Sequence, residues 1–136
     1  MVREIQRINP VGLYDPSANG YTHVAIVPPG ATLIYVAGQG GEDENGTLVD
    51  DFAVQLKQAF ANLCVALTAA GASPENVVKL TTLVVDHNES KLQLLGVQVQ
   101  AMWGEQTPTQ TLIPVPRLAL DGMLFEVDAV AVIPNS

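Results

Sequence analysis

The stretch that decides the fold is Thr107 to Val132, TPTQTLIPVPRLALDGMLFEVDAVAV. Its last part alternates as a half-buried strand does, and one face carries the neighbouring acids Glu126 and Asp128. The opposite face is wholly apolar: Phe125, Val127, Ala129, Ala131 and Ile133. Two carboxylates side by side on a half-buried face are costly unless something pairs with them or uses them. Glu126 is therefore a candidate functional acid.

The rest of the chain predicts five more strands and two helices. The strands are expected near 3–8, 22–27, 32–37, 77–85 and 109–115, ahead of the last one at 123–133. Helices are expected over 49–70, with Asp50 and Asp51 in the first turn and Gly71 as its stop, and over 89–103, between Asn88 and Gly104. Pro28-Pro29-Gly30 indicates a hairpin turn between the second and third strands.

This order, β-β-β-α-β-α-β-β, predicts an α+β two-layer sandwich in which two helices cover one face of a mixed β-sheet. Because both faces of the strands are rich in apolar residues, the second face also has to be buried. Oligomerisation would bury it.

Length and composition limit the classes of function. The 136 residues predict a single domain, 1–136, and the net charge of −8 with only six Lys and Arg argues against nucleic acid as a partner. No signal-peptide core and no stretch of transmembrane length is visible, so a cytoplasmic protein without membrane contact is expected. Cys64 is alone and follows a helical pattern, which favours a core thiol. No spacing of His, Cys and carboxylate residues indicates a metal site.

The C-terminal stretch resembles the signature of the RidA (YjgF, endoribonuclease L-PSP) family of small trimeric proteins. That signature runs proline, small residue, arginine, small residue, strand, variable turn, and an apolar-Glu-apolar strand. Pro108, Thr109, Thr111 and the triplet 125–127 fit it, whereas Gln110 stands at the arginine position. The resemblance implies a chorismate-mutase-like fold, a homotrimer with small-molecule clefts between subunits, and no cofactor.

The resemblance also assigns roles to single residues. It implies that Glu126 positions water or polarises the ligand; otherwise Glu126 is an acid at a sheet edge or subunit contact, solvated or paired with Arg117. The family arginine grips a substrate carboxylate, which a neutral glutamine amide binds less strongly. Gln110 therefore either accepts an uncharged ligand or is a surface or interface residue. Arg117 either replaces the lost charge or forms a salt bridge at the rim.

Two shorter segments also resemble the family. Gly20-Tyr21-Thr22-His23 is similar to a Pro-Tyr-Ser-Gln segment whose tyrosine lines the cleft; a tyrosine packing at a hairpin edge is the alternative. His23 is either a proton shuttle or a solvated strand histidine. Ala37-Gly38-Gln39 is similar to Ser-Gly-Gln, in which glycine lets the backbone approach the ligand. The cleft asparagine and cysteine of the family fall at Gly96 and near Leu112.

Three functions follow from these observations. The resemblance implies an enamine or imine deaminase, which hydrolyses its substrate to a carbonyl compound and ammonia. Glu126 would be the catalytic residue, and Tyr21, Gly38, Gln110, Thr111 and Arg117 would bind the ligand. The loss of the arginine argues against 2-iminopropionate as the substrate. The alternative is a non-catalytic protein that binds a small metabolite on the same fold. No specific feature indicates a purely structural role.

Overall fold

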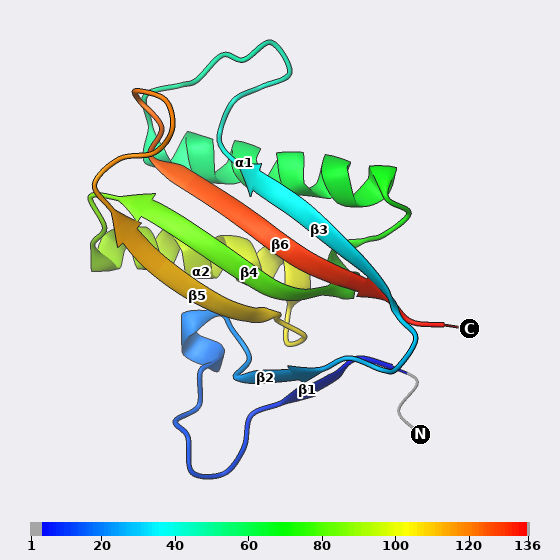
Figure 1. Cartoon of the computed structure of the whole chain (residues 1–136). Helices are drawn as coiled ribbons and strands as arrows, with labels where there is room; N and C mark the ends of the chain where they lie inside the picture. The colour runs from blue at the N-terminus through cyan, green and yellow to red at the C-terminus, as the bar shows by residue number, and fades with distance from the viewer. Residues whose placement is uncertain (1–3, 136) are drawn as a thin grey trace.

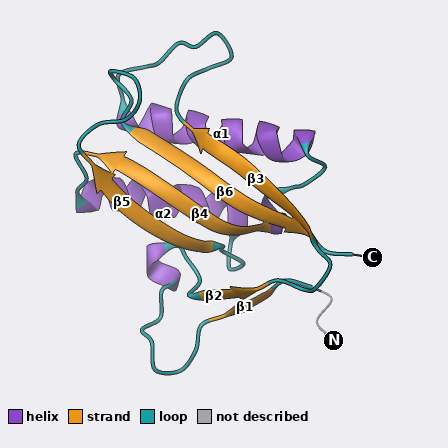
Figure 2. Ribbon diagram, viewed as in Figure 1, coloured by secondary structure: helices purple, strands orange, loops and turns teal. Residues whose placement is uncertain are grey.

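The computed structural model describes residues 4–135, and its centre is a four-stranded mixed sheet. The strand order is β3 (Thr32–Gln39), β6 (Phe125–Ile133), β4 (Val77–Val85) and β5 (Thr109–Val115). β6 pairs antiparallel with both β3 and β4, and β4 pairs parallel with β5. The helices α1 (Phe52–Ala69) and α2 (Glu89–Trp103) lie together on one face of this sheet (Figures 1 and 2). The predicted α+β class and the helix layer are confirmed.

Both helices begin at a capping side chain. Asp51 accepts a hydrogen bond from the Val54 N–H at 2.9 Å, and Asn88 accepts one from the Lys91 N–H at 2.9 Å. Each bond satisfies a backbone donor that the helix itself leaves free. The sequence predicted that Asp50 and Asp51 lie in the first turn of the helix, and this is wrong. α1 begins at Phe52, so Asp51 is its N-cap residue and Asp50 precedes the helix. Gly71 follows the end of α1 in the left-handed region, at φ 78°.

The core lies between the helices and the sheet. Phe60 of α1 stacks on Phe125 of β6 with ring centroids 5.8 Å apart, and meets Trp103 of α2 edge-on at 6.1 Å. Buried aliphatic side chains from each layer surround these rings: Leu56, Leu63, Leu67, Leu80, Val84, Leu95, Val99 and Val127. The apolar face of β6 predicted from the sequence is thus the one that the helices cover.

α1 corrects one expectation drawn from the sequence. Its 18 residues are long and apolar enough to cross a membrane by length and composition alone. Its buried side chains Leu56, Phe60, Leu63 and Leu67 recur at helical spacing and pack on the sheet. This packing is that of the core helix of a folded domain, which passes the same test.

The first two strands form a sheet of their own, so the predicted hairpin is wrong. β1 (Gln6–Ile8) pairs antiparallel with β2 (Val24–Ile26), whereas β3 pairs with β6. The segment between β2 and β3 contains Pro28 and Pro29, which have no N–H to donate to a ladder. The small sheet is tied to the rest of the chain by Arg7, whose Nη2 donates to the Glu75 carbonyl at 2.9 Å.

The face of the large sheet opposite the helices is uncovered. Leu33 and Tyr35 of β3 are 54% and 75% exposed there, and Ile113 of β5 is 43% exposed. Monomeric proteins rarely leave such a broad apolar sheet face in water. The fold therefore contains the second apolar face that the sequence indicated.

Candidate functional site

Glu126 lies on the uncovered face of β6, directly beside the backbone of β3. On one side the register places it opposite Leu83 of β4. On the other side the ladder with β3 is irregular between Val36 and Gln39, where Gly38 is. A Cβ atom on Gly38 would lie 2.5 Å from the Glu126 Cδ and 2.7 Å from its Oε2. Only a glycine at position 38 leaves room for the carboxyl group in this place.

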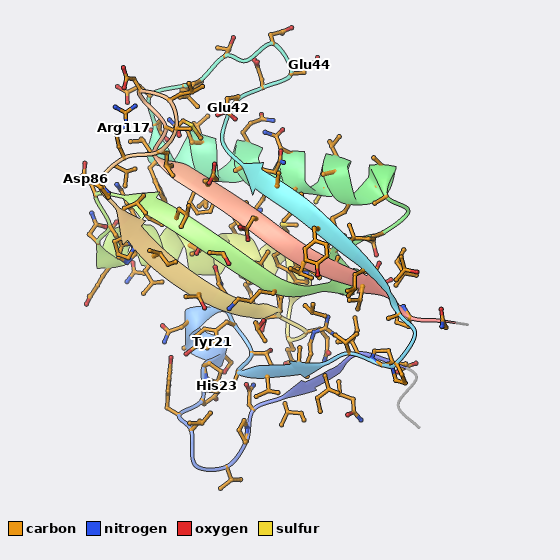
Figure 3. The ribbon with its side chains drawn as sticks, viewed as in Figure 1. Tyr21, His23, Glu42, Glu44, Asp86 and Arg117 are labelled. Atoms are coloured by element: carbon orange, nitrogen blue, oxygen red, sulfur yellow. The ribbon has the colours of Figure 1, made fainter. Side chains whose placement is uncertain are left out.

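The electrostatic surroundings favour the protonated form of Glu126. Burial raises the pKa of this carboxyl group, and the negative charges of Asp128 and Glu42 raise it further. Asp128 is two residues along the same strand face, and Glu42 comes from the loop after β3 (Figure 3). Within residues 4–135 no cation forms an ion pair with Glu126. A carboxyl group held in this way is suited to exchange protons with a bound molecule.

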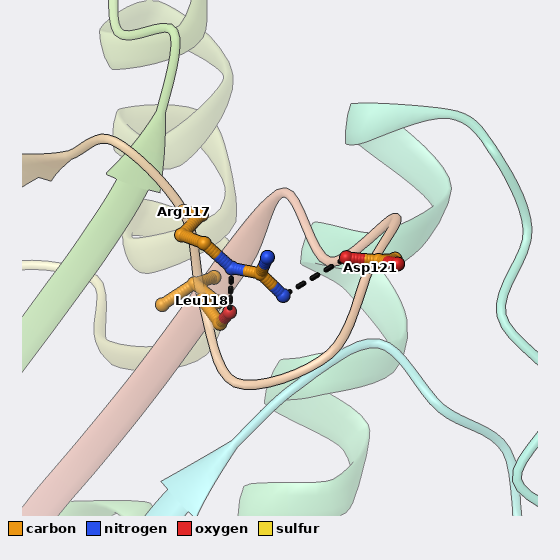
Figure 4. A network of polar contacts seen from close by, with 3 residues as sticks. All are labelled: Arg117, Leu118 and Asp121. Carbon is orange, nitrogen blue, oxygen red and sulfur yellow. Dashed lines mark hydrogen bonds and ion pairs between the residues drawn. The ribbon is translucent and has the colours of Figure 1, made fainter.

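Arg117 is bound within its own loop. Its Nη2 lies 2.9 Å from Asp121 Oδ1 and its Nε donates to the Leu118 carbonyl at 3.1 Å (Figure 4). The side chains of Arg117 and Asp121 are 66% and 95% exposed. This is the rim salt bridge that the sequence left open as an alternative, and in this arrangement the guanidinium reaches neither Glu126 nor Gln110.

Gln110 is on the side of the sheet that faces the helices. Its Oε1 accepts a hydrogen bond from Thr82 Oγ1 at 3.2 Å, and its Nε2 donates to the Gly20 carbonyl at 3.4 Å. The amide thus links β4 to the turn that precedes Tyr21. One N–H and one lone pair of the amide remain for another partner. Thr111, the next residue, points to the uncovered face, where its Oγ1 accepts from Lys79 Nζ at 2.7 Å.

Tyr21 belongs to a cluster of three aromatic rings near the start of β5. Its hydroxyl is hydrogen-bonded to that of Tyr14, and this bond raises the pKa of Tyr21 to about 12. His23 packs edge-on against both tyrosine rings at 5.4 Å and donates from Nε2 to the Tyr14 carbonyl at 2.8 Å. The segment is held in place by Thr22, whose N–H donates to the Pro108 carbonyl at 3.1 Å.

The single chain does not bring all these residues together. Glu126 is opposite Leu83, Leu83 is opposite Ile113, and Gln110 is three residues before Ile113 on β5. Strand spacings of about 4.8 Å and rises of about 3.3 Å per residue then separate Glu126 from Gln110 by about 14 Å. The odd offset also places the two side chains on opposite faces of the sheet. Gly38 and Glu126 therefore form one half of the candidate site, and Tyr21 and Gln110 form the other.

Sequence reasoning missed two residues near these halves, Tyr14 and Glu42, and two grooves in the surface. Tyr14 and Glu42 lie in turn-rich loops, where no periodicity indicates which side chain meets which. A groove of 990 Å³ lies between the 3₁₀ turn η1 (Ser17–Asn19) and α2, and Gly96 forms part of it. A smaller groove of 620 Å³ lies between Asp43, Glu44 and α1. Residues 4–135 contain no cluster of three or more His, Cys, Asp or Glu side chains suited to a metal ion.

Comparison with known proteins gives consistent results. Residues 14–133 match the Endoribonuclease L-PSP family. The chain is 32% identical over 103 residues to the RutC family protein YjgH of Escherichia coli, covering 76% of this chain and 77% of that one. It is 31% identical to the RutC family protein slr0709 of Synechocystis, over 99% of this chain and 97% of the relative.

Solved structures agree in fold. YyfB from Yersinia pestis, described as a protein of unknown function of the conserved Rid family, superposes with a TM-score of 0.90 at 34% identity, over 95% of this chain and 98% of that one. RidA from an Antarctic Psychrobacter superposes with a TM-score of 0.66 at 27% identity, over 92% of each chain. The shared fold, the family match over most of the chain and these relatives establish that the protein belongs to the RidA/YjgF family.

Proposed function

We propose that the protein is a homotrimer with a small-molecule cleft between subunits, and that it hydrolyses an uncharged enamine or imine to a carbonyl compound and ammonia. The observation that carries this proposal is the Glu126 carboxyl group, packed against the Gly38 backbone, with a raised pKa and acids rather than a cation as its charged neighbours. The family resemblance supports the reaction class.

The chemistry assigns Glu126 a proton-transfer role. An enamine first takes a proton at carbon and releases one from nitrogen, which gives the imine. Protonated Glu126 donates its proton to the imine nitrogen, the oxygen of water attacks the carbon, and one proton of that water returns to the Glu126 carboxylate, which gives the carbinolamine. Glu126 then protonates the amino group, the C–N bond breaks to release ammonia, and the hydroxyl proton passes back to Glu126 as the carbonyl group forms. A carboxyl group with a raised pKa holds its proton more readily than an ordinary one and can both donate it and take it back, as this sequence requires.

The arrangement of the two halves supports a cleft between subunits. Glu126 and Gln110 are on opposite faces of the same sheet, about 14 Å apart, and Tyr21 follows the turn that Gln110 holds, so a small ligand is not expected to touch both halves of one chain. The uncovered face bearing Leu33, Tyr35 and Ile113 offers the surface on which a second copy would bury apolar area. Light scattering at micromolar concentration tests the trimer, and a monomer would remove the proposed cleft.

Gln110 supports an uncharged substrate. A charge-assisted hydrogen bond is worth about 1.5–3 kcal/mol, against about 1 kcal/mol for a neutral one. Gln110 lacks the charge, and its amide already has two partners within the chain. The difference of about 0.5–2 kcal/mol means that a carboxylate would bind about 2- to 30-fold more weakly here than at an arginine.

The test compares two imines made in the assay. A serine dehydratase supplies 2-iminopropionate, and a flavin amine oxidase acting on benzylamine supplies an uncharged imine; semicarbazide trapping reports how long each imine survives. We expect the protein to shorten the lifetime of the uncharged imine more than that of 2-iminopropionate. The variant Glu126→Gln should lose this acceleration, and Glu105→Gln, the same change at an exposed acid in the turn after α2, is the matched control. Equal acceleration by wild type and Glu126→Gln would refute the assigned role.

A second function has its own support. The internal hydrogen bonds of Gln110, and apolar Ala37 and Leu112 at positions where the resemblance implies serine and cysteine, favour a protein that binds a small metabolite without converting it. Saturable binding of a small molecule without acceleration of either imine would favour this alternative.

A further inference from the structure

Glu42 lies just beyond the end of β3, and its carboxyl group is held against bare backbone as that of Glu126 is (Figure 3). A Cβ atom on Gly40 would lie 2.7 Å from the Glu42 Oε1 and 2.9 Å from its Oε2. Gly38, which accommodates Glu126 in the same way, is two residues before Gly40, a separation of about 7 Å in extended chain. The two carboxyl groups therefore lie over neighbouring glycines, and the charge of Glu42 acts on Glu126.

Contacts with α1 fix the loop that carries Glu42. Asn62 Nδ2 donates to the carbonyl groups of Gly40 and Glu42, at 3.0 and 2.8 Å. A Cβ atom on Gly41 would lie 2.6 Å from the Cα of Gln55, so this glycine packs directly on the helix backbone. The backbone from Gly40 to Glu42 is thus bound to α1, and the fold itself sets the place of the Glu42 side chain.

The Glu42 carboxyl group also lies close to a buried apolar side chain. The Cβ position of Gly40 that is 2.7 Å from the Glu42 Oε1 is also 2.7 Å from the Cε of Met123. Met123 is 7% exposed and comes three residues before Glu126 in the chain. Glu42 itself is partly buried. Surroundings of this kind screen a charge less than water does, so the charge of Glu42 acts more strongly on its neighbours.

Among residues 4–135, no cation forms an ion pair with Glu42 or Glu126. β6 adds a further acid, Asp128, on the face of Glu126, and β4 places Leu83 opposite it. Lys79 of β4 is four residues before Leu83, about 13 Å along the strand, and its Nζ donates to the Thr111 hydroxyl at 2.7 Å. A positive charge that forms on a molecule bound beside Glu126 would therefore be attracted by the neighbouring acids.

We propose that Glu42 is a second functional acid of the hydrolysis, which acts by its negative charge and takes up no proton. When Glu126 gives its proton to the imine nitrogen, the cation formed on the substrate is stabilised by the Glu42 carboxylate. Before that step the same charge favours the proton on Glu126. The inference rests on the proposed function and adds to it a residue of this chain to which the resemblance assigns no role.

The test pairs Glu42→Gln with Glu44→Gln, the same change at an exposed acid two residues later in the same loop. Carbon NMR of the labelled carboxyl groups follows the titration of Glu126, and the assay with the uncharged imine gives the rate between about pH 6 and 9. Because the reaction needs protonated Glu126, its rate falls as the pH rises through the pKa of this group.

We expect Glu42→Gln to lower the pKa of Glu126, to move the fall in rate to lower pH, and to reduce the rate near pH 7 at least about threefold. Glu44→Gln should behave as wild type. Glu42→Asp keeps the charge and should stay closer to wild type than Glu42→Gln does. A role in packing alone would not produce this order of pH profiles.

Glu42→Gln preserves the shape of the side chain and should fold, which circular dichroism and thermal unfolding check. If it does not, Asn62→Ala takes its place, because it removes both hydrogen bonds that hold the Glu42 backbone and should shift the Glu126 titration in the same direction.

Two results would overturn the role of Glu42 alone: an unchanged Glu126 titration and rate profile in the folded variant, and equal changes in Glu44→Gln. In both cases wild type still accelerates hydrolysis and Glu126→Gln does not. A wild-type protein that accelerates hydrolysis of neither imine would instead remove the proposed function, and the role of Glu42 with it.

Discussion

Gly38→Ala is the change that most directly tests the geometry around Glu126. The new Cβ would lie 2.5 Å from the Glu126 Cδ, whereas ordinary contact starts at 3.4 Å, so the carboxyl group must retreat by about 0.9 Å. Gly38 is not in the left-handed region, so alanine fits its backbone conformation. The obstacle is the mobile end of a side chain, and we expect the free energy of unfolding to change by less than about 1 kcal/mol.

The effect on hydrolysis should be much larger than the effect on stability. A displacement of the order of 1 Å at a reacting group costs about 10²-fold in rate. We therefore expect Gly38→Ala to reduce acceleration of the uncharged imine about 100-fold while its melting temperature stays near that of wild type. The pKa of Glu126, followed by carbon NMR of the labelled carboxyl group, should change as well, because the methyl group alters its contact with water.

Ala61→Ser is the control, since it adds one heavy atom at an exposed position of α1 that belongs to none of the candidate site residues. The imine assay and the NMR titration are run on wild type and both variants. The geometry would be refuted if Gly38→Ala kept both the rate and the Glu126 pKa of wild type. A loss of rate shared equally by Ala61→Ser would show that the effect does not arise at Glu126.

Three further predictions follow from particular residues. Because the pKa of Glu126 is raised above 4.5, the folded state holds more protons than the unfolded state from about pH 4.5 up to the folded-state pKa, and stability falls as pH rises through that window. Glu126→Gln should therefore raise the melting temperature near pH 8 and leave it unchanged near pH 4; an equal gain at both pH values would contradict the assignment. Gly96→Ala should stabilise the protein by about 1 kcal/mol in urea unfolding, because α2 gains helix propensity, and a loss of stability would mean that position 96 is packed. Tyr14→Phe should lower the pKa of Tyr21 from about 12 toward 10.0, seen as earlier tyrosinate absorbance in an ultraviolet titration; an unchanged curve would show that the two hydroxyl groups do not bond.

The parts of the fold that depend on local patterns could be predicted from the sequence. The alternation in β6 and the helical spacing in α1 place apolar side chains on one face whatever the remainder of the chain does. The pairing of β2 could not be predicted in this way. Pro28-Pro29-Gly30 has the composition of a hairpin turn, which would pair β2 with β3. In the structure β2 pairs with β1 and β3 pairs with β6, so the partner of each strand depends on the backbone groups of strands far away in the sequence. These are contacts between distant segments.

The candidate site likewise contains residues that the sequence could predict and residues that it could not. Glu126 could be predicted because a carboxylate in an apolar strand is exceptional in any context. Its neighbour Glu42 could not, since nothing in an acidic, glycine-rich loop indicates that one of its acids faces β6. Arg117 is the reverse case. Its charge suggested a ligand, but its guanidinium forms an exposed ion pair at 2.9 Å with Asp121, four residues later in the same loop.

Gln110 has a structural role of its own, in addition to lacking the positive charge that an arginine would carry. An arginine at this position would place a cation on the helix side of the sheet, where Thr82 and the Gly20 carbonyl now share a neutral amide. The glutamine amide accepts a hydrogen bond from the Thr82 hydroxyl and donates one to the Gly20 carbonyl. A guanidinium could not accept from Thr82, because it only donates. By these two hydrogen bonds Gln110 fixes the turn that carries Tyr21 and borders the groove along α2. In the proposed function, the same neutral amide is the reason why an uncharged ligand is expected in place of a carboxylate.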